Sequence, residues 1–341
     1  MNRDAQIEGF LARHGFADAR GSPLAQDASF RRYLRLTGGP APAVLMDAPP
    51  PEDVRPFLRI ARHLAGIGLS VPTVFGADEA NGFLLEEDLG DGLISSLLDA
   101  PQSPGAQPET STPPDALFDG AVDALLAMQR AAPPPDLPAW NAEAMTQTAA
   151  ANLIDWWWPA MMGQPAPEAA RTDFTRALEI VLEPLRTGPR GFVHRDYFAG
   201  NLLHLPTRPG IRAVGIIDFQ SAAIGHPAYD LVSLLQDARR DIPPSIHPPA
   251  LAHYLAARPD LDPIAFRAAY AACAVQRHLR VACQWVRLAK RDNRPQYLVH
   301  GPRTWRLLAA ALTQDQAKPL MQAFDRWIPM DLRRNPPGLA A

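Results

Sequence analysis

The order of strand-like and helix-like segments constrains the fold of this chain more than any other sequence feature. Apolar residues alternate or run together, as in strands, at 29–38, 41–49, 73–79 and 82–90. After residue 114 they recur at helical spacing, and three short strand-like runs interrupt them. Strands grouped apart from helices are typical of α+β folds. We therefore predict an α+β fold with two lobes, a small antiparallel-sheet N-lobe and a larger, mainly helical C-lobe.

The two lobes are expected at residues 1–88 and 89–341, with a Pro-rich loop at 101–114 that is low in apolar residues. The N-lobe is expected to start with a helix whose apolar stripe covers 7–16, followed by a break at 21–23 and, further on, a helix at 52–68. The short strands of the C-lobe are "GFVHRD", "NLLHL" and "AVGIIDF". The other predicted helices are 115–132, 142–162, 167–187, 228–240, 248–257, 263–291 and 301–312.

Composition and charge exclude several classes of protein. The 341 residues carry a formal net charge of -3, whereas a broad nucleic-acid surface needs an excess of Lys and Arg. No run of about 18 apolar residues and no signal-peptide pattern is present, so we expect a cytoplasmic monomer that binds neither nucleic acid nor membrane. The two cysteines, Cys273 and Cys283, are too few for a disulfide framework or a Cys-based zinc site, and we expect them buried on a helix.

Lysine occurs only at Lys290 and Lys318. The first 289 residues therefore contain neither the Walker A P-loop, which needs G-x-x-x-x-G-K-[ST], nor the strand lysine of protein kinases. ATP-binding motifs that depend on a lysine are therefore absent from this part of the chain.

The segment "FVHRDYFAGNLLHLP", residues 192–206, sets His194, Arg195 and Asp196 at the end of one apolar run and Asn201 at the start of the next. Alone, it is typical of a polar turn. A further strand-like run, "IRAVGIIDF", ends in Asp218, 22 residues after Asp196. H-R-D-x-x-x-x-N followed by a strand and D-F is the arrangement used for phosphoryl transfer.

This chemistry gives each residue type a reason to be present. Asp196 is expected to orient the acceptor hydroxyl and accept its proton, and Asn201 and Asp218 to supply oxygen ligands for Mg²⁺. His194 is expected to support the loop by hydrogen bonding. Arg195 could steady a carboxylate or meet a phosphate, and the sequence leaves both open.

"HRDYFAGN", "IIDFQ" and "GHPAYDLVSLL" together resemble the aminoglycoside phosphotransferase and choline kinase superfamily. The resemblance implies a two-lobed, protein-kinase-like fold and a structural role for Asp230 at a helix start. "DASFRRYLRL", "LMDAPP", "GFLLEEDLG" and residues 276–298 more narrowly resemble the branch that phosphorylates N-acetylmuramate and N-acetylglucosamine at the anomeric hydroxyl.

The function that this resemblance implies is an ATP-dependent, Mg²⁺-requiring sugar kinase that makes the sugar 1-phosphate in the recycling of cell-wall peptidoglycan sugars. Two alternatives stay open. One keeps the fold and takes an aminoglycoside, choline or another small alcohol as acceptor. The other is a catalytically silent, kinase-like binding protein, which the missing lysine favours and the complete set of Asp196, Asn201 and Asp218 opposes.

The nucleotide-binding candidates are Ser29, Phe30, Arg31, Arg32 and Glu87. The usual lysine position falls near Met46 or Asp47. Backbone N–H groups of a turn at 29–30 could hold phosphate, and one of the two arginines could replace the lysine charge. Alternation places Arg31 and Arg32 on opposite strand faces, and the sequence does not decide which face meets the nucleotide. Glu87 lies in "LLEEDLGDG", the expected connection between lobes.

The candidates for sugar contacts are Arg195, Gln220, Trp156 and Arg277. Gln220 follows the metal-binding segment directly. Trp156 belongs to three consecutive tryptophans, which project about 100° apart on a helix, so most of them are expected in the core. Arg277 and its neighbour His278 are candidates for a muramic carboxylate, and an ion pair at the surface or between the lobes is at least as well supported.

Overall fold

The computed structural model describes residues 2–24, 31–99 and 112–339. The chain divides into two compact units, unit 1 with residues 1–113 and 199–221, and unit 2 with residues 114–198 and 222–341. Unit 1 holds a five-stranded sheet and unit 2 is mainly helical, which confirms the predicted α+β fold. The unit boundaries differ from the expected lobe boundary at residue 88, because 199–221 belongs to the unit with the sheet. The lobe division itself stays a prediction.

The sheet of unit 1 is antiparallel, with strand order β1-β2-β3-β5-β4. The strands are β1 (Arg20–Pro23), β2 (Arg32–Thr37), β3 (Ala43–Asp47), β4 (Val74–Asp78) and β5 (Phe83–Glu87). The predicted β2–β3 hairpin is confirmed. The expected break at 21–23 was wrong, because β1 pairs with β2 there as an edge strand. Pro23 is tolerated at a sheet edge, where a missing N–H costs no ladder bond.

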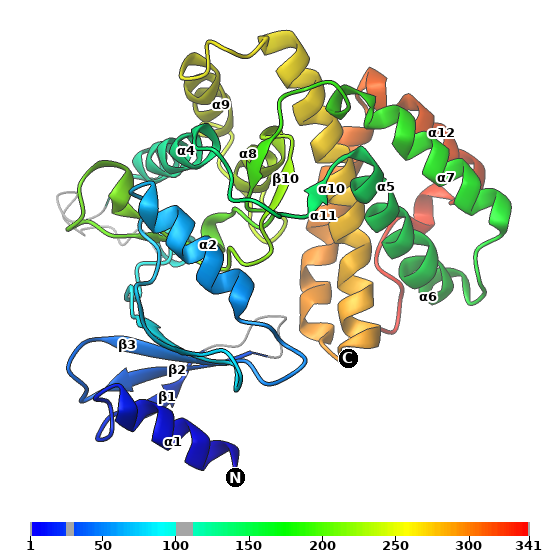
Figure 1. Cartoon of the computed structure of the whole chain (residues 1–341). Helices are drawn as coiled ribbons and strands as arrows, with labels where there is room; N and C mark the ends of the chain where they lie inside the picture. Colours follow the sequence, from blue (N-terminus) through cyan, green and yellow to red (C-terminus); the bar gives the residue numbers. More distant parts are fainter. Residues whose placement is uncertain (1, 25–30, 100–111, 340–341) are drawn as a thin grey trace, which may run out of the picture. The chain divides into compact units, whose positions relative to one another are not determined.

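The two faces of this sheet have different partners. Helix α1 (Arg3–Arg13) covers one face, where Phe10 packs with Leu45, Phe83 and Leu85 in a buried core. Helix α2 (Arg55–Gly66) lies on the other side of the sheet (Figure 1). Full burial of each such large apolar side chain contributes about 2 kcal/mol. All of β3 is buried on both faces of the sheet, as are the first four residues of β5.

A second hairpin completes unit 1. Strands β8 (Leu202–His204) and β9 (Val214–Ile216) pair antiparallel, and the segment 92–93 leads past them into α3 (Ile94–Asp99). A Cβ at Gly92 would lie 2.5 Å from the carbonyl oxygen of His204, so this close approach requires glycine. The 3₁₀ turn η4 (Ala199–Asn201) precedes β8, and the 3₁₀ turn η5 (Gly210–Ala213) lies in the connection between β8 and β9.

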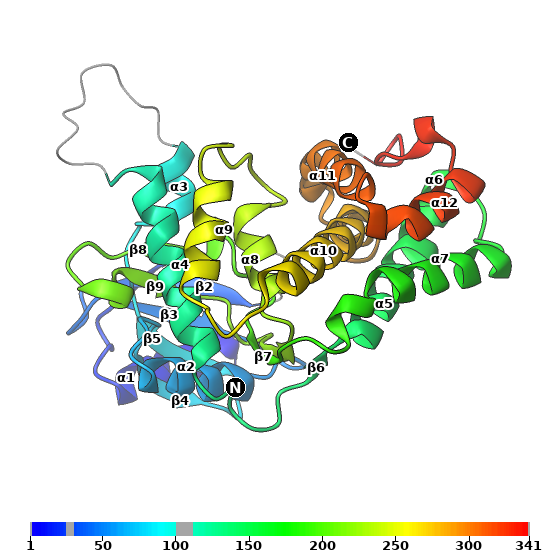
Figure 2. The same ribbon diagram turned by 90° about the horizontal axis from the view of Figure 1, so that it is seen from above.

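Helix α10 (Pro263–Arg291) is the central element of unit 2 and packs against α5, α8 and α11 (Figure 2). Asp262 caps it by accepting the Ile264 N–H at 2.9 Å. Cys273 and Cys283 are buried on α10, as predicted. The other helices of this unit are α4 (Pro114–Arg130), α5 (Ala142–Ala151), α6 (Trp158–Met162), α7 (Glu168–Val181), α8 (Ala228–Leu235), α9 (His247–Ala256), α11 (Gly301–Leu312) and α12 (Lys318–Trp327).

The helix predicted at 142–162 is interrupted by a π-helical segment, η2 (Asn152–Trp157). The π-helical segment packs against α10, a contact that the local sequence pattern does not reveal. Trp157 and Trp158 are buried as expected, and Trp157 donates its ring N–H to the Arg334 carbonyl at 2.8 Å. The helix predicted at 228–240 ends earlier, at Leu235, and α3 and α12 were not predicted.

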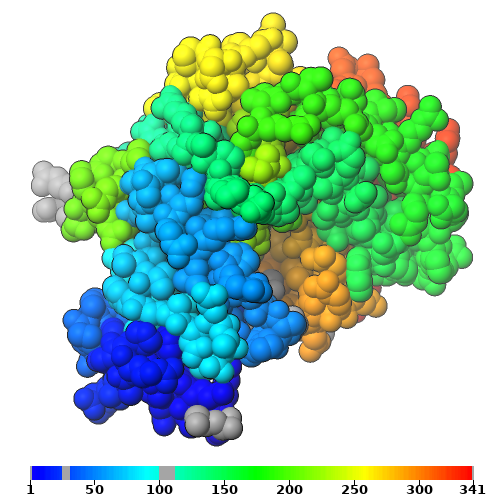
Figure 3. Space-filling view, viewed as in Figure 1, coloured from blue at the N-terminus to red at the C-terminus, as the bar shows by residue number. Residues whose placement is uncertain are grey.

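Three short strands of unit 2 form a small sheet, namely β6 (Ala139–Trp140), β10 (Ala223–Gly225) and β7 (Gly191–Val193). The remaining short helical turns are η3 (Glu183–Leu185), η6 (Pro295–His300), η7 (Asp315–Ala317) and η8 (Met330–Leu332). Helices α7 and α9, green and yellow in Figure 3, lie at the surface of this unit. Among the residues that the structure describes, no helix combines the length and apolar composition that crossing a bilayer requires.

Candidate active site

The His194–Asp196 segment follows β7. Its backbone is hydrogen-bonded to Asp230, which lies in the first turn of α8. The backbone N–H groups of His194 and Arg195 donate to the two Asp230 carboxyl oxygens at 2.6 and 2.9 Å. Burial raises the pKa of Asp230 to about 7, although these two N–H groups oppose the rise. Asp230 therefore positions the loop through backbone contacts, the structural role implied by the resemblance.

Three further contacts fix the shape of this loop. The N–H of Asp196 donates to Nδ1 of the buried His194 at 3.3 Å, and the His194 ring lies edge-on to Tyr197. The Tyr197 hydroxyl donates to the Ala121 carbonyl of α4 at 2.7 Å. Arg195 has a φ of 77°, a left-handed conformation that costs energy for a bulky residue. Strain held by this many contacts is typical of a functional loop.

Asp196 lies among three arginines of unit 2, which we call the arginine cluster: Arg195, Arg277 and Arg280. Burial alone would raise the pKa of the Asp196 carboxyl. Arg280, Arg277 and Arg195 outweigh that effect and hold the pKa below its ordinary value. Asp196 is therefore ionised at neutral pH, ready to accept a hydrogen bond from a hydroxyl.

Trp140, at the end of β6, organises the arginine cluster. The Arg195 guanidinium lies 4.0 Å from the centre of the Trp140 ring, and that of Arg280 lies 5.8 Å from it. Arg277 donates from Nη1 to the Arg195 carbonyl at 3.5 Å. Stacking on an aromatic face holds a guanidinium flat while its N–H edge stays available for hydrogen bonds.

Asn201 and Asp218 lie close together in unit 1. In the sequence, Asn201 directly precedes β8 and Asp218 follows β9. Asn201 donates from Nδ2 to Asp218 Oδ2 at 3.3 Å, and Gln220 donates from Nε2 to Asp218 Oδ1 at 2.6 Å. Asp218 has a φ of 61°, a second left-handed non-glycine residue at the predicted site. Gln220, predicted as a sugar contact, thus lies against the predicted metal ligand.

The donor set of Asn201 and Asp218 fits Mg²⁺, which prefers carboxylate and amide oxygens and keeps several non-protein ligands. The described part of the chain contains no cluster of three or more His, Cys, Asp or Glu side chains that could hold a metal ion. A magnesium ion here would therefore share its coordination with phosphate oxygens and water.

The sheet face opposite α1 carries Tyr33, Met46 and Glu86. Tyr33 pairs in register with Met46, and Glu86 with Val44. Burial raises the pKa of the Tyr33 hydroxyl, the charges of Glu86 and Asp218 add to the rise, and Arg31 opposes it. This is the face with Asp218 nearby, so the structure places Arg31, and not Arg32, with the predicted metal ligand.

Glu86 is 5% exposed, and one of its carboxyl oxygens has no hydrogen-bond partner among the described residues. Burial raises its pKa to about 8, against the attraction of Arg31. At neutral pH the group is mainly protonated and adds little negative charge to this face. Arg31 itself pairs with Glu52 at 3.1 Å.

The other nucleotide-binding candidates lie elsewhere. Arg32 donates from Nε to Asp47 at 3.0 Å on the α1 face, where Arg3 binds the same buried carboxylate at 3.0 Å. Glu87 accepts hydrogen bonds from Thr73 and pairs with Arg208. Ser29 and Phe30 lie outside the described residues. Trp156 is half-buried on η2. His278 donates from Nε2 to Gln236 Oε1 at 2.7 Å.

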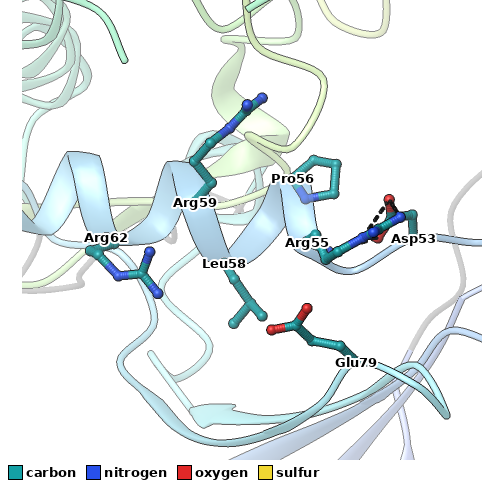
Figure 4. Close-up of a pocket in the computed structure, with 7 residues that line it drawn as sticks. All are labelled: Asp53, Arg55, Pro56, Leu58, Arg59, Arg62 and Glu79. Atoms are coloured by element: carbon teal, nitrogen blue, oxygen red, sulfur yellow. Dashed lines mark hydrogen bonds and ion pairs between the residues drawn. The ribbon is translucent and has the colours of Figure 1, made fainter. Parts of the chain in front are cut away.

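A surface pocket of about 440 Å³ in unit 1 contains none of the predicted residues. It lies along α2 and is lined by Asp53, Arg55, Pro56, Leu58, Arg59, Arg62 and Glu79 (Figure 4). Arg55 is engaged with Asp53 at 2.9 Å.

With this geometry established, comparison with known proteins gives a consistent result. The model of the family described as "Phosphotransferase enzyme family" matches residues 20–267. The chain belongs to this phosphotransferase family. The resemblance predicted from the sequence motifs is thereby confirmed.

Two curated relatives of this phosphotransferase share the name "N-acetylmuramate/N-acetylglucosamine kinase". The protein of Caulobacter vibrioides is 34% identical over 371 residues, covering 97% of this chain and 98% of the relative. The protein of Pseudomonas aeruginosa is 36% identical over 302 residues, covering 86% and 83%. These matches confirm the predicted similarity to that branch.

Solved structures support the fold. A choline/ethanolamine kinase family protein from Mesorhizobium loti matches with a TM-score of 0.61 at 14% identity, covering 94% of this chain and 99% of that one. The GDP and kanamycin complex of aminoglycoside phosphotransferase APH(2")-IIIa matches with a TM-score of 0.60 at 15% identity, covering 91% and 99%. At these identities the likeness concerns the fold.

Sequence reasoning missed four residues of the phosphotransferase that lie beside predicted ones: Tyr33, Glu86, Trp140 and Arg280. Arg280 had a detectable signal, since it follows Arg277 by three residues on a helix and so shares its face. Trp140 had none, because β6 is a two-residue strand whose neighbours come from distant segments.

Proposed function

We propose that this phosphotransferase is an ATP-dependent kinase that transfers a phosphoryl group to the anomeric hydroxyl of N-acetylmuramate or N-acetylglucosamine. The product would be the sugar 1-phosphate, for reuse of cell-wall sugars. The observation that carries the proposal is the loop that Asp230 clamps, with its ionised Asp196, together with the name shared by relatives of 34% and 36% identity.

Asp196 is the proposed base. Its carboxylate would accept a hydrogen bond from the anomeric hydroxyl and take the proton as that oxygen bonds to the γ-phosphorus of ATP and the bond from this phosphorus to ADP breaks. Because its pKa is low, Asp196 is a weak base, so its main contribution is to orient the hydroxyl. That suffices for phosphoryl transfer, whose loose transition state demands positioning more than deprotonation. A hemiacetal hydroxyl is also more acidic than an ordinary alcohol.

Asn201 and Asp218 are the proposed metal ligands. A bound Mg²⁺ would neutralise charge on the phosphates of ATP. Gln220 holds Asp218 through its 2.6 Å hydrogen bond and keeps the carboxylate orientation fixed. We assign Gln220 to this support as well as to a sugar contact.

Residues 1–88 are the proposed nucleotide-binding lobe, and 89–341 the catalytic and substrate-binding lobe. Arg31 would supply the positive charge that lysine supplies in other kinases. It lies on the same sheet face as Tyr33, and the charges of both Arg31 and Asp218 act on the Tyr33 hydroxyl. A protonated Glu86 on the same face would not repel phosphate at neutral pH. Met46 of β3 then occupies this face without a charge of its own.

The alternative acceptors receive less support. Aminoglycosides and choline are cations. The charges that act most strongly on Asp196 are also positive: that of Arg280, followed by those of Arg277 and Arg195. A cation would have to approach Asp196 against three guanidinium groups. A catalytically silent protein would not need the His194–Asp196 loop to be held by Asp230 with Arg195 in a left-handed conformation.

The test is ADP release by the purified chain with ATP and one of four acceptors: N-acetylmuramate, N-acetylglucosamine, kanamycin or choline. We expect turnover with the two sugars and its abolition by EDTA, with recovery on excess Mg²⁺. Phosphorus NMR of the product should show coupling to the anomeric proton. Turnover with kanamycin or choline instead would transfer the proposal to those acceptors, and no turnover with any of them would favour the silent protein.

A further inference from the structure

Helix α10 carries a row of arginines that the proposed reaction does not explain. Arg277, Arg280 and Arg287 fall within about 80° of arc on one helical face, at 100° per residue. Arg277 is 4% exposed and Arg280 is 8% exposed. Like charges at this spacing destabilise a helix, and buried charges are costly unless they are paired. Asp196, Asp230 and Asp237 are the carboxyl groups whose pKa Arg277 lowers, but burial outweighs that effect and raises the pKa of Asp230 and of Asp237, so Asp196 is the one with a lowered pKa beside this row.

The hydrogen bonds of these arginines are incomplete within the protein. Arg280 donates from Nη1 to Gln284 at 2.9 Å, and Arg277 makes one long bond of 3.5 Å to a carbonyl. The Nε–H groups of Arg277 and Arg280 have no hydrogen-bond partner among the described residues. Two buried guanidinium groups thus retain donor capacity beside the proposed base.

The geometry of unit 2 suits a planar anion. The Arg280 guanidinium lies 5.8 Å from the Trp140 ring centre, and Arg195 lies over the same ring at 4.0 Å. A guanidinium supported in this way presents a rigid fork that matches a carboxylate. Both α10 arginines also lie close enough to Asp196 to lower the pKa of its carboxyl, so they border the position of the acceptor hydroxyl.

We infer that Arg277 and Arg280 bind the carboxylate of an anionic sugar acceptor, the lactyl group of N-acetylmuramate, and so make it a better acceptor than N-acetylglucosamine. This inference rests on the proposed function. The lactyl ether stands on C3, two ring carbons from the anomeric carbon. Groups that border the anomeric hydroxyl are therefore within reach of the lactyl carboxylate on the same sugar.

A simpler role for the arginines is to keep Asp196 ionised. That role would affect every acceptor equally, because each presents the same anomeric hydroxyl. Carboxylate binding instead affects only the acceptor that has a carboxylate, and mainly through KM.

The first experiment uses the wild-type chain and three acceptors: N-acetylmuramate, its methyl ester and N-acetylglucosamine. We expect kcat/KM to be about 10- to 100-fold higher for the free acid than for the ester, the usual range for a charge-assisted hydrogen bond. Equal values for acid and ester would overturn the inference and leave the proposed function intact. No turnover with any of the three would overturn the proposed function, and the inference with it.

The second experiment compares Arg280→Met with Arg267→Met, an exposed position on the same helix about 20 Å away at 1.5 Å per residue. We expect Arg280→Met to lower the ratio of kcat/KM for N-acetylmuramate to that for N-acetylglucosamine by about 10- to 100-fold. Arg267→Met should leave both values unchanged.

Circular dichroism and thermal unfolding check that the variants fold. Arg280→Lys keeps the charge and loses the planar fork, so it should show an intermediate loss that is again confined to N-acetylmuramate. An equal loss for all three acceptors in the Arg280 variants would show that the arginines serve Asp196 alone, and would overturn the inference.

Discussion

Two carboxyl groups, one in each unit, show how the surroundings decide the charge of a buried acid. Burial raises the pKa of both Asp196 and Glu86. In unit 2 the arginine cluster outweighs burial and holds the pKa of Asp196 below its ordinary value. In unit 1 Glu86 has Arg31 as the cation that opposes burial, and its pKa rises to about 8.

Both carboxyl groups are buried, so the number of nearby cations separates the proposed base from the neutral acid. The ionised Asp196 can receive a hydroxyl proton at any physiological pH. The protonated Glu86 leaves its sheet face free of negative charge, which suits a face proposed to meet the phosphates of ATP.

The largest effect is expected for Asp196→Asn. The variant keeps the side-chain shape and removes the proton acceptor, so kcat should fall by about 10³-fold with both sugars, within the usual range for a general base. ADP release measures it. Asp119→Asn, an exposed position on α4, is the control and should keep full activity. Turnover near the wild-type rate in Asp196→Asn would remove the base assignment.

The second effect concerns Asp218, the proposed metal ligand in unit 1. Asp218→Asn removes the charge that would hold Mg²⁺, so kcat should fall at least ~100-fold and the Mg²⁺ concentration for half-maximal activity should rise. A Mg²⁺ titration of ADP release tests this, with the exposed Asp18→Asn as control. An unchanged Mg²⁺ requirement would contradict the assignment.

The third effect is on stability and comes from Glu86→Gln. A carboxyl whose pKa rises from 4.5 to about 8 on folding stabilises the fold fully only below 4.5, and this contribution is lost as pH rises through 8. The variant stays neutral. The difference in the free energy of unfolding between the variant and the wild type should therefore increase in favour of the variant, by on the order of 2 kcal/mol from pH 6 to pH 8.5.

Urea unfolding at the two pH values measures this gain. Glu79→Gln, at an exposed position, should show no pH-dependent gain. If the wild type and Glu86→Gln lose stability in parallel across this range, the carboxyl is not protonated at neutral pH and the contrast with Asp196 fails.

The smallest effect is expected for Arg31→Met, which should raise the KM for ATP about 10-fold and leave the KM for sugar unchanged, as one lost charge-assisted contact to phosphate would. Arg32→Met provides the comparison. Arg32 pairs with the buried Asp47 on the α1 face. We therefore expect the Arg32→Met variant to have a lower melting temperature than the wild type and a nearly unchanged KM for ATP. The reverse result would assign the phosphates to the α1 face.

Much of this organisation followed from local sequence. The hairpin of β2 and β3, the limits of α10 at residues 263 and 291, and the motif residues from His194 to Asp218 were all predicted from spacing and residue type. Strand β1 was missed, because Gly21 and Pro23 are typical of a break and only pairing with β2 makes them a strand. The π-helical turn at 152–157 was missed for a similar reason, since it depends on packing against α10.

The sequence by itself determined which chemical groups are available: an H-R-D loop, an asparagine, a strand-end aspartate and no lysine before residue 290. It also determined the fold class, because periodicity depends on neighbours along the chain. Folding in three dimensions places Arg31 on the sheet face of Glu86, Arg280 beside Asp196, and Trp140 against the guanidinium groups of Arg195 and Arg280. Charge acts through space, so the pKa of a carboxyl depends on groups that folding brings together from distant parts of the sequence.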